Sequence, residues 1–378
     1  MPTDPAQIAA LHRDAPLTDI HVHPSLKAYL FRRNLWRHYG SGSTFNPFSS
    51  RSDFTMLEAG GVGVIWAAHY FPERELFRQC LAMTLAGLIA VPVYARLMTG
   101  DRLLRLFEMM DALEREVARR PDRVELARSA ADVTRIRAAG RMAVVHTVEG
   151  AHVLEGDAAK LDLLAARGVA MITLCHFFQN GIAAQTRGIP TSNLVNRVCP
   201  YDFSWSANVP LTDYGRDVLR GMARLGMLVD VTHCAPAARQ AVLAEVGQRP
   251  VVASHVGVQG VNPDPYNLAD EEIRAIAAGG GLIGVIFMTY WLHPDGPKHG
   301  LDAIWRTLEH IHTVCGSFDH VALGTDFDGF TDPPDDVEDA SRMGAVTAML
   351  LDRGVPDADV RKILGGNARR VLERGWGT

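Results

Sequence analysis

The sequence lacks the features that would place it outside the globular enzymes. Only 21% of its 378 residues are charged and the net charge is −5, so no basic stripe is present and nucleic acid is excluded as a main partner. No glycine-rich phosphate loop follows any apolar run, which disfavours a nucleotide-binding open sheet. No internal repeat, low-complexity tract or long linker divides the chain. An apolar content of 47% is ordinary for a globular enzyme.

Cysteine is scarce and scattered. No two cysteines form a C-x-x-C pair, and we expect reduced thiols rather than a disulfide framework. The first residues show no basic segment followed by an apolar one, and the last residues show no hydrophobic anchor. We therefore expect a cytoplasmic protein without a membrane partner. The five cysteines are Cys80, Cys175, Cys199, Cys234 and Cys315.

Residues 81–98 form a strongly apolar segment. Its uninterrupted part is shorter than the roughly 20 residues that span a bilayer, and it contains Pro92 and Arg96. We expect a buried helix here, with a helix that touches a membrane as the alternative.

Eight apolar runs rich in valine and isoleucine alternate with amphipathic helical patterns. Such runs are typical of parallel strands covered on both faces, and the repeated alternation predicts a (β/α)8 TIM barrel of the metallo-dependent hydrolase type, forming one α/β domain over residues 1–378. Two insertions, 24–61 and 177–210, are expected to cover the carboxyl face of the barrel. The expected strands are 17–23, 62–69, 142–149, 169–176, 227–233, 250–255, 282–288 and 320–326.

Candidate metal ligands stand at the ends of these runs, where a TIM barrel assembles its active site. His21 and His23 are two apart in a strand, so their side chains should point to one face and share an ion. Glu149 ends the third run and could bridge two cations. Together with His233 and His255 these residues suit a two-zinc site, because neutral imidazoles are good zinc ligands. Hydrogen-bonded core histidines and a strand-end salt bridge are the alternatives.

Two more strand-end residues could take part in catalysis. Asp326 ends the eighth run and could move a proton from a bridging water to the leaving group. His176 ends the fourth run and could bind the substrate by polarising its carbonyl or stabilising an oxyanion. Structural or supporting roles are expected for Asp328, His69, His146 and His152, and packing roles for Cys175 and Cys234.

Six motifs along the chain form a recognisable set. They are V-E-G-A-H at 148–152, L-C-H at 174–176, the segment 210–233, P-V-V-A-S-H at 250–255, G-T-D-F-D-G at 324–329 and G-G-N-A-R-R-V-L-E at 365–373. Together these motifs resemble the membrane (renal) dipeptidase family of zinc peptidases, a branch of the amidohydrolase-like barrels. The resemblance covers almost the whole chain and implies a (β/α)8 barrel with two zinc ions. It implies that Glu149 bridges the ions, that His21 and position 23 bind one ion, and that His233 and His255 bind the other. His176 would bind substrate or its oxyanion, and Asp326 would handle the proton.

The chain departs from this family at two positions. The family's first motif is H-x-D, whereas this chain has His23 where the aspartate stands, which still provides a ligand. The family also has an arginine, just before an asparagine, that grips the carboxylate of a dipeptide. Tyr266 takes that position before Asn267, so both are candidates for substrate binding, but a phenol cannot form a bidentate clamp. Arg187 or Arg197 in the second insertion could compensate.

These observations predict a metallo-dipeptidase-like hydrolase with two Zn²⁺ ions, other divalent metals being possible. It would cleave a dipeptide or a related small amide by a metal-bridging hydroxide. One alternative is an amidohydrolase acting on a lactone, a lactam or an N-acyl amide that lacks the dipeptide carboxylate. Another is a catalytically silent metal-binding barrel. The expected partner is a small molecule, and a homodimer is left open.

Overall fold

A closed barrel of eight parallel strands forms the centre of the molecule. The computed structural model describes residues 4–40, 49–89, 91–188, 198–199, 201–202, 209–295, 300–329 and 331–377. Neighbouring strands pair in parallel, and the pairing of β2 with β4 closes the ring. The predicted (β/α)8 barrel is confirmed, and each barrel strand lies within or next to a predicted run. The barrel strands are β1 (Leu17–Val22), β2 (Val62–His69), β4 (Met142–Glu149), β5 (Val169–Thr173), β6 (Leu228–Asp230), β7 (Val251–Val256), β8 (Leu282–Val285) and β9 (Val321–Leu323).

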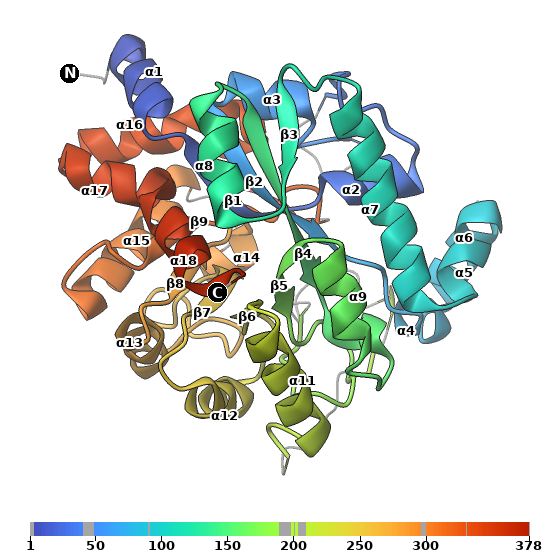
Figure 1. The fold of residues 1–378 in the computed structure, drawn as a ribbon. Coiled ribbons are helices and arrows are strands. Elements are labelled where there is room, and N and C mark those ends of the chain that lie inside the picture. The colour runs from blue at the N-terminus through green and yellow to red at the C-terminus, as the bar shows by residue number, and fades with distance from the viewer. Residues whose placement is uncertain are drawn as a thin grey trace.

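Helices surround the strands in chain order, as the colour sequence in Figure 1 shows. The helix Asp213–Arg224 has Thr212 as its N-cap, whose side chain accepts from Gly215 N. Near the carboxyl terminus, the helices Gly344–Asp352 and Asp357–Arg361 are separated near Pro356, which a helix interior does not tolerate. The helices are α1 (Pro5–Asp14), α2 (Pro24–Leu30), α3 (Phe54–Ala59), α4 (Glu75–Arg78), α5 (Leu81–Ile89), α6 (Val91–Met98), α7 (Arg102–Ala118), α8 (Ala130–Ala138), α9 (Lys160–Ala166), α11 (Asp213–Arg224), α12 (Pro236–Val246), α13 (Asp270–Ala278), α14 (Thr289–Leu292), α15 (Gly300–Cys315), α16 (Gly344–Asp352), α17 (Asp357–Arg361) and α18 (Asn367–Gly375).

Side chains fill the barrel and its amino end. Each of the eight barrel strands contributes to one buried apolar cluster, which includes Ile20, Trp66 and Val252. Residues of α8 and α18, among them Ile136 and Leu372, complete this cluster. Because packing occupies the interior and the amino end, polar side chains gather at the carboxyl ends of the strands, as in other TIM barrels.

A ninth strand, β3 (Val124–Ala127), was not predicted. It pairs with the amino-terminal half of β4, whose carboxyl-terminal half pairs with β5 instead. The strand has only four residues and half-buried side chains at Glu125 and Leu126, so its sequence lacks the long apolar run that marks the other strands.

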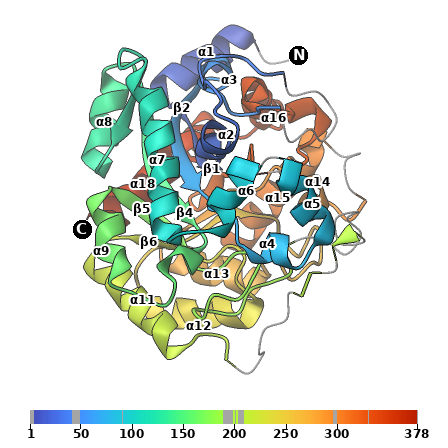
Figure 2. The same cartoon turned by 90° about the vertical axis from the view of Figure 1, so that its right-hand side faces the viewer.

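The apolar segment 81–98 differs from the expected buried helix. It forms α5 and α6, which project beyond the ring of helices and lie in front of the barrel in Figure 2. Leu81 is 73% exposed and Leu85 is 54% exposed, so much of this apolar surface faces outward. Among the described residues, the helices are all too short or too polar to cross a bilayer.

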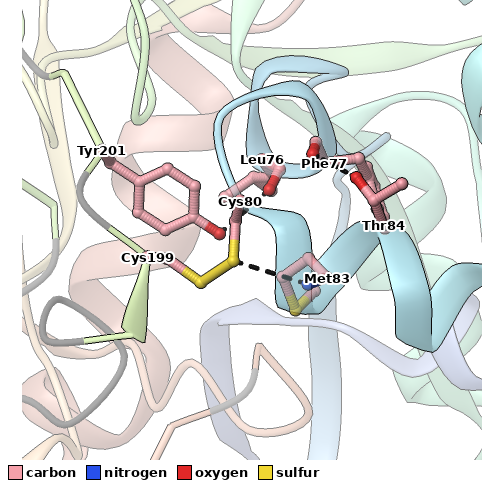
Figure 3. Close-up of a disulfide and its surroundings, with 7 residues drawn as sticks. All are labelled: Leu76, Phe77, Cys80, Met83, Thr84, Cys199 and Tyr201. Atoms are coloured by element: carbon pink, nitrogen blue, oxygen red, sulfur yellow. Dashed lines mark hydrogen bonds between the residues drawn. A yellow bond between two sulfur atoms is a disulfide. The ribbon is translucent and has the colours of Figure 1, made fainter.

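A disulfide joins Cys80, which precedes α5, to Cys199 in the insertion after β5 (Figure 3). The two cysteines are 119 residues apart, and the Tyr201 hydroxyl donates to the Leu76 carbonyl beside them at 3.0 Å. The expectation of reduced thiols is therefore wrong for this pair, because pairing depends on two segments, after β2 and after β5, that meet only in the folded barrel. Disulfides persist mainly in oxidising compartments, so the cysteines no longer support a cytoplasmic location. Cys175, Cys234 and Cys315 are free.

Candidate metal centre

Four histidines and one glutamate converge at the carboxyl end of the barrel. The Nε2 atoms of His21 and His23 lie 3.1 Å apart, and those of His233 and His255 also lie 3.1 Å apart. Glu149 lies between the two pairs. Its Oε1 is 3.4 Å from His21, 3.2 Å from His233 and 3.3 Å from His255, and its Oε2 is 3.5 Å from His23. All five side chains are buried.

These distances fit two cations. Two nitrogens that bind one tetrahedral zinc at 2.0–2.1 Å lie about 3.3 Å apart. Unprotonated imidazole nitrogens that face each other at such a distance repel unless a cation lies between them. Burial, followed by the charge of nearby histidines, lowers the pKa of His21 and of His233 to about 4, which favours the neutral form that binds metal. The donor set therefore fits two divalent ions with Glu149 between them.

Local irregularities of the backbone direct these side chains inward. The pairing of β1 with β2 shifts register between Asp19 and Val22, and that of β7 with β8 shifts between Ala253 and Val256. His21 and His255 lie within these shifts, and such bulges redirect side chains. His233 has φ 66°, a left-handed conformation that non-glycine residues adopt mainly where function demands it.

Buried polar groups behind the histidines fix their tautomers. Ser254 Oγ donates to Asp230 Oδ2 at 2.6 Å, so it accepts from Nδ1 of His255 at 2.8 Å and from Nδ1 of His21 at 3.2 Å. Asp230 is held in turn by the Thr173 hydroxyl at 2.6 Å. With the proton on Nδ1, both histidines present an Nε2 lone pair to the site. These roles of Ser254 and Asp230 were not predicted from the sequence, although both residues lie inside the motifs 210–233 and 250–255.

Asp326 borders the first histidine pair. Its Oδ1 is 3.0 Å from His23 Nε2 and 3.9 Å from His21 Nε2. Burial alone would raise the pKa of Asp326, but the hydrogen bond from His23 and the surrounding histidines lower it below its usual value. The side chain is 13% exposed, against 4% for Glu149, so Asp326 is the more accessible of the two carboxylates. Asp326 also has φ 59°, the second left-handed residue of the centre.

His176 lies on the other side of Glu149. Its Nε2 is 3.7 Å from Glu149 Oε1, and its ring centroid is 4.5 Å from that of His233. Its Nδ1 is 3.1 Å from a carboxylate oxygen of Glu73. Burial alone would lower the pKa of His176, but the charges of Glu73 and Glu149 raise it above its usual value. Glu73 was not predicted from the sequence, because it stands in a loop without a motif.

The polar side-chain groups of Tyr266 and Asn267 are both hydrogen-bonded within the protein. The Tyr266 hydroxyl donates to the carbonyl of His255 at 2.9 Å, and the ring stacks on Trp291 with centroids 4.4 Å apart. Its ring edge meets His233 with centroids 5.2 Å apart, so Tyr266 can offer an aromatic surface but not its hydroxyl.

The Asn267 side chain is committed to the backbone. Its Oδ1 accepts from Gly257 N at 3.0 Å, and its Nδ2 donates to the carbonyls of Asn262 and Trp291. The structure thus corrects the prediction that Asn267 binds substrate: its amide fixes the loop. Arg187 is exposed, and Arg197 lies outside the described residues.

Other polar residues near strand ends support the fold. His146 lies beside His69, with His69 Nε2 and His146 Nδ1 2.8 Å apart, which agrees with the structural role expected of His146. His152 Nε2 donates to the carbonyl of Phe71 at 2.8 Å. The Asp328 carboxylate accepts from the backbone nitrogens of Arg51 and Ser52, so its predicted role in orienting a loop is confirmed.

Histidines and carboxylates gathered at the carboxyl end of a (β/α)8 barrel define the class of metal-dependent barrel hydrolases. Within that class, the chain belongs to the membrane dipeptidase family (Peptidase family M19), whose family profile matches residues 5–375. It is 28% identical to Dipeptidase ataJ of Aspergillus terreus over 391 residues, covering 95% of this chain and 84% of that protein.

Solved structures share the fold. The probable dipeptidase PvdM from Pseudomonas aeruginosa has a TM-score of 0.78 at 21% identity, covering 98% of this chain and 99% of that one. A metallopeptidase from Rhodobacter sphaeroides, liganded with a phosphinate mimic of the dipeptide L-Ala-D-Ala, has a TM-score of 0.76 at 22% identity, covering 96% and 99%. The family match over residues 5–375 identifies the chain as a dipeptidase-like, metal-dependent hydrolase.

Proposed function

We propose that this protein is a two-zinc hydrolase that cleaves the amide bond of a dipeptide or a closely related small molecule. The observation that carries the proposal is the pair of Nε2–Nε2 contacts at 3.1 Å with the Glu149 carboxylate between them. Four imidazole nitrogens favour zinc over magnesium, which prefers oxygen ligands. When bound there, two such ions would supply Lewis acidity and would lower the pKa of a coordinated water molecule.

Residues of the chain itself would perform the other steps of the reaction. Glu149 holds the two histidine pairs in one site. Asp326, the more exposed carboxylate, takes a proton from the attacking water on its Oδ1 and returns it to the leaving amine. His176 directs Nε2 toward the substrate carbonyl and donates to the oxygen as negative charge develops there.

Metal analysis and a substrate panel test this proposal together. Protein purified without chelator should contain close to two zinc ions per chain and should hydrolyse at least one compound among free dipeptides, their C-terminal amides, N-acyl amino acids and lactones. Removal of the metal should abolish turnover, and added zinc should restore it. Two bound ions without hydrolysis of any compound would favour the catalytically silent barrel. Zero or one ion in an active preparation would contradict the two-metal site.

A second candidate substrate is an amide or lactone without the dipeptide carboxylate. It is favoured by Tyr266, which stands where the family resemblance places an arginine and whose hydroxyl is already bonded to His255. Loss of a charged hydrogen bond should weaken binding by about 1.5–3 kcal/mol, roughly 10- to 150-fold.

We expect wild-type protein to show no strong preference for a free dipeptide over its C-terminal amide. Tyr266→Arg tests the missing clamp, and Tyr266→Phe is its matched control. Only the arginine variant should gain activity on the free dipeptide. A strong preference of the wild type for the free carboxylate would show that another cation has replaced the clamp.

A further inference from the structure

Glu73, in the loop between β2 and α4, is a buried carboxylate whose side chain is 2% exposed. Such a group is costly to bury unless it is fully hydrogen-bonded. Glu73 accepts from the Tyr70 hydroxyl at 2.5 Å, from Nδ1 of His176 at 3.1 Å, and from the backbone nitrogens of Phe177 at 3.0 Å and Phe178 at 3.4 Å. Three of these four donors belong to one short segment that begins with His176.

The two oxygens of Glu73 have different partners. Oε1 accepts both backbone N–H groups and so anchors the main chain of Phe177 and Phe178. Oε2 accepts from the Tyr70 hydroxyl and makes the shorter of the two contacts with Nδ1 of His176, 3.1 Å against 3.3 Å. One oxygen therefore fixes the loop, while the other fixes a side chain. A residue that served the loop alone would need only the first set of bonds.

The ring of His176 is held on its remaining sides by aromatic groups. The Tyr70 ring lies 4.3 Å from it and the Phe177 ring 3.8 Å, centroid to centroid. With Nδ1 held at Glu73, Nε2 is the nitrogen that faces Glu149 at 3.7 Å. A flip of the ring would place carbon atoms where both nitrogens now find partners, so the Glu73 bond selects one orientation.

We propose that Glu73 is a positioning residue that aims Nε2 of His176 at the carbonyl oxygen of the bound substrate. The proposal rests on the proposed function, because it assumes that His176 contacts the carbonyl. It adds to that function a carboxylate–histidine pair built from the loops after β2 and β5, with Glu73 acting on the reaction only through His176.

The Glu73→Gln variant separates the two sets of bonds. Glutamine can still accept the backbone N–H groups through Oε1, but its amide nitrogen cannot accept from Nδ1 of His176. We expect kcat to fall about 10- to 100-fold, the range seen when a carboxylate that orients a histidine is removed, with KM and zinc content nearly unchanged. Glu75→Gln is the matched control, since it makes the same change two residues away and should keep full activity. An unchanged kcat in Glu73→Gln would overturn the proposal.

A double-mutant cycle with His176→Gln tests whether Glu73 acts through the histidine. If it does, the Glu73→Gln/His176→Gln double variant should be no slower than His176→Gln alone. Multiplying effects would show that Glu73 contributes independently, which contradicts the proposal. If Glu73→Gln does not fold, Glu73→Asp keeps the charge but shortens the reach, and the same cycle applies to it.

An NMR measurement separates this proposal from the proposed function. In protein with ¹⁵N-labelled histidine, the His176 ring, identified by its absence in His176→Gln, should show a protonated and hydrogen-bonded Nδ1 that is lost in Glu73→Gln. This result would stand even if no compound of the panel were hydrolysed, in which case only the proposed function would fail. An Nδ1 resonance unaffected by Glu73→Gln would overturn the pairing itself.

Discussion

Glu149 is the residue on which both histidine pairs converge. Its carboxylate lies within 3.5 Å of all four Nε2 atoms, and its negative charge would offset the repulsion between two divalent ions. Glu149→Gln keeps the size of the side chain but removes the charge, so we expect zinc content to fall well below two ions per chain, with loss of activity. Elemental analysis after gel filtration checks this. Glu155→Gln, the same change at an exposed position, should retain both ions; full occupancy in Glu149→Gln would refute the bridging role.

Asp326 can be tested as a proton carrier against the alternative of a metal ligand. Its Oδ1 lies 3.0 Å from His23 Nε2, close enough for either role. We expect Asp326→Asn to reduce turnover by about 10²–10⁴, the usual scale for a general acid–base group, while zinc content stays near that of the wild type. Loss of one ion per chain would instead identify Asp326 as a ligand of the first pair. Asp335→Asn, the same change at an exposed position, provides the control.

The residues that could be predicted from sequence are those at the ends of long apolar strands. His21, Glu149, His233 and His255 follow such strands, and the structure brings them together. The residues that support them were missed for a physical reason: the Glu73 carboxylate is surrounded by hydrogen-bond donors only because the loop after β5 folds over it. Asn267 was misjudged because the backbone groups that bind its amide are not visible in the sequence.

At the level of elements, Glu114 links the outer helix α7 to the barrel strand β4 and to Arg167. It lies on α7, 3.3 Å from His146 of β4, and accepts from Arg167 at 2.7 Å. The hydrogen bond with His146 is the main reason that the pKa of Glu114 is lowered to about 2. Burial opposes this shift of the pKa, and Arg167 adds to it. Since the folded pKa lies below the unfolded value of 4.5, the ionised group stabilises the fold above about pH 4.5, and this contribution is lost as the pH falls toward 2.

The Glu114→Gln variant should therefore be less stable than the wild type near neutral pH, and the gap should close as the pH is lowered. Denaturant midpoints measured from about pH 6 to about pH 3 would show this convergence. The effect should be modest because the glutamate side chain is 26% exposed. Arg167→Gln should reproduce part of it. A gap that stays constant over this range would mean that Glu114 does not titrate with the expected shift.

Elements with a clear hydrophobic pattern in their own sequence could be predicted, whereas elements that depend on contacts with other parts of the fold could not. The eight barrel strands follow from continuous apolar runs. β3 has a run of only four residues and is recognisable only from its pairing with β4. The segment 81–98 was read as buried because of its composition, but Leu81 and Leu85 face outward, since burial depends on what packs against a helix.

At the scale of the whole molecule, the disulfide ties the segment between β2 and α5 to the insertion after β5. Cys80 follows the loop that carries Glu73, and Cys199 lies in the insertion that begins beyond His176. Around it, Phe178 and Tyr201 form a small apolar cluster separate from the main core. Because few other apolar residues join this cluster within the described part of the chain, the covalent bond should matter more for these two segments than for the barrel.

Removal of this bond should destabilise the protein and impair substrate binding while leaving the metal centre intact. Protein purified without reductant should yield a Cys80–Cys199 cross-linked peptide on mass-spectrometric mapping. The Cys80→Ser/Cys199→Ser variant should lose about 2–4 kcal/mol of stability, since the loop that it opens spans 119 residues. We expect a raised KM and near-normal zinc content, because the ligands stand on or just beyond the ends of barrel strands rather than on the two cross-linked segments. Cys315→Ser, which removes a free cysteine, should change none of these quantities.

Two outcomes would contradict a stabilising role of the disulfide. They are free thiols at positions 80 and 199 in air-purified protein, and a double variant as stable as the wild type. Either would show that the segments of Cys80 and Cys199 keep their place without the cross-link.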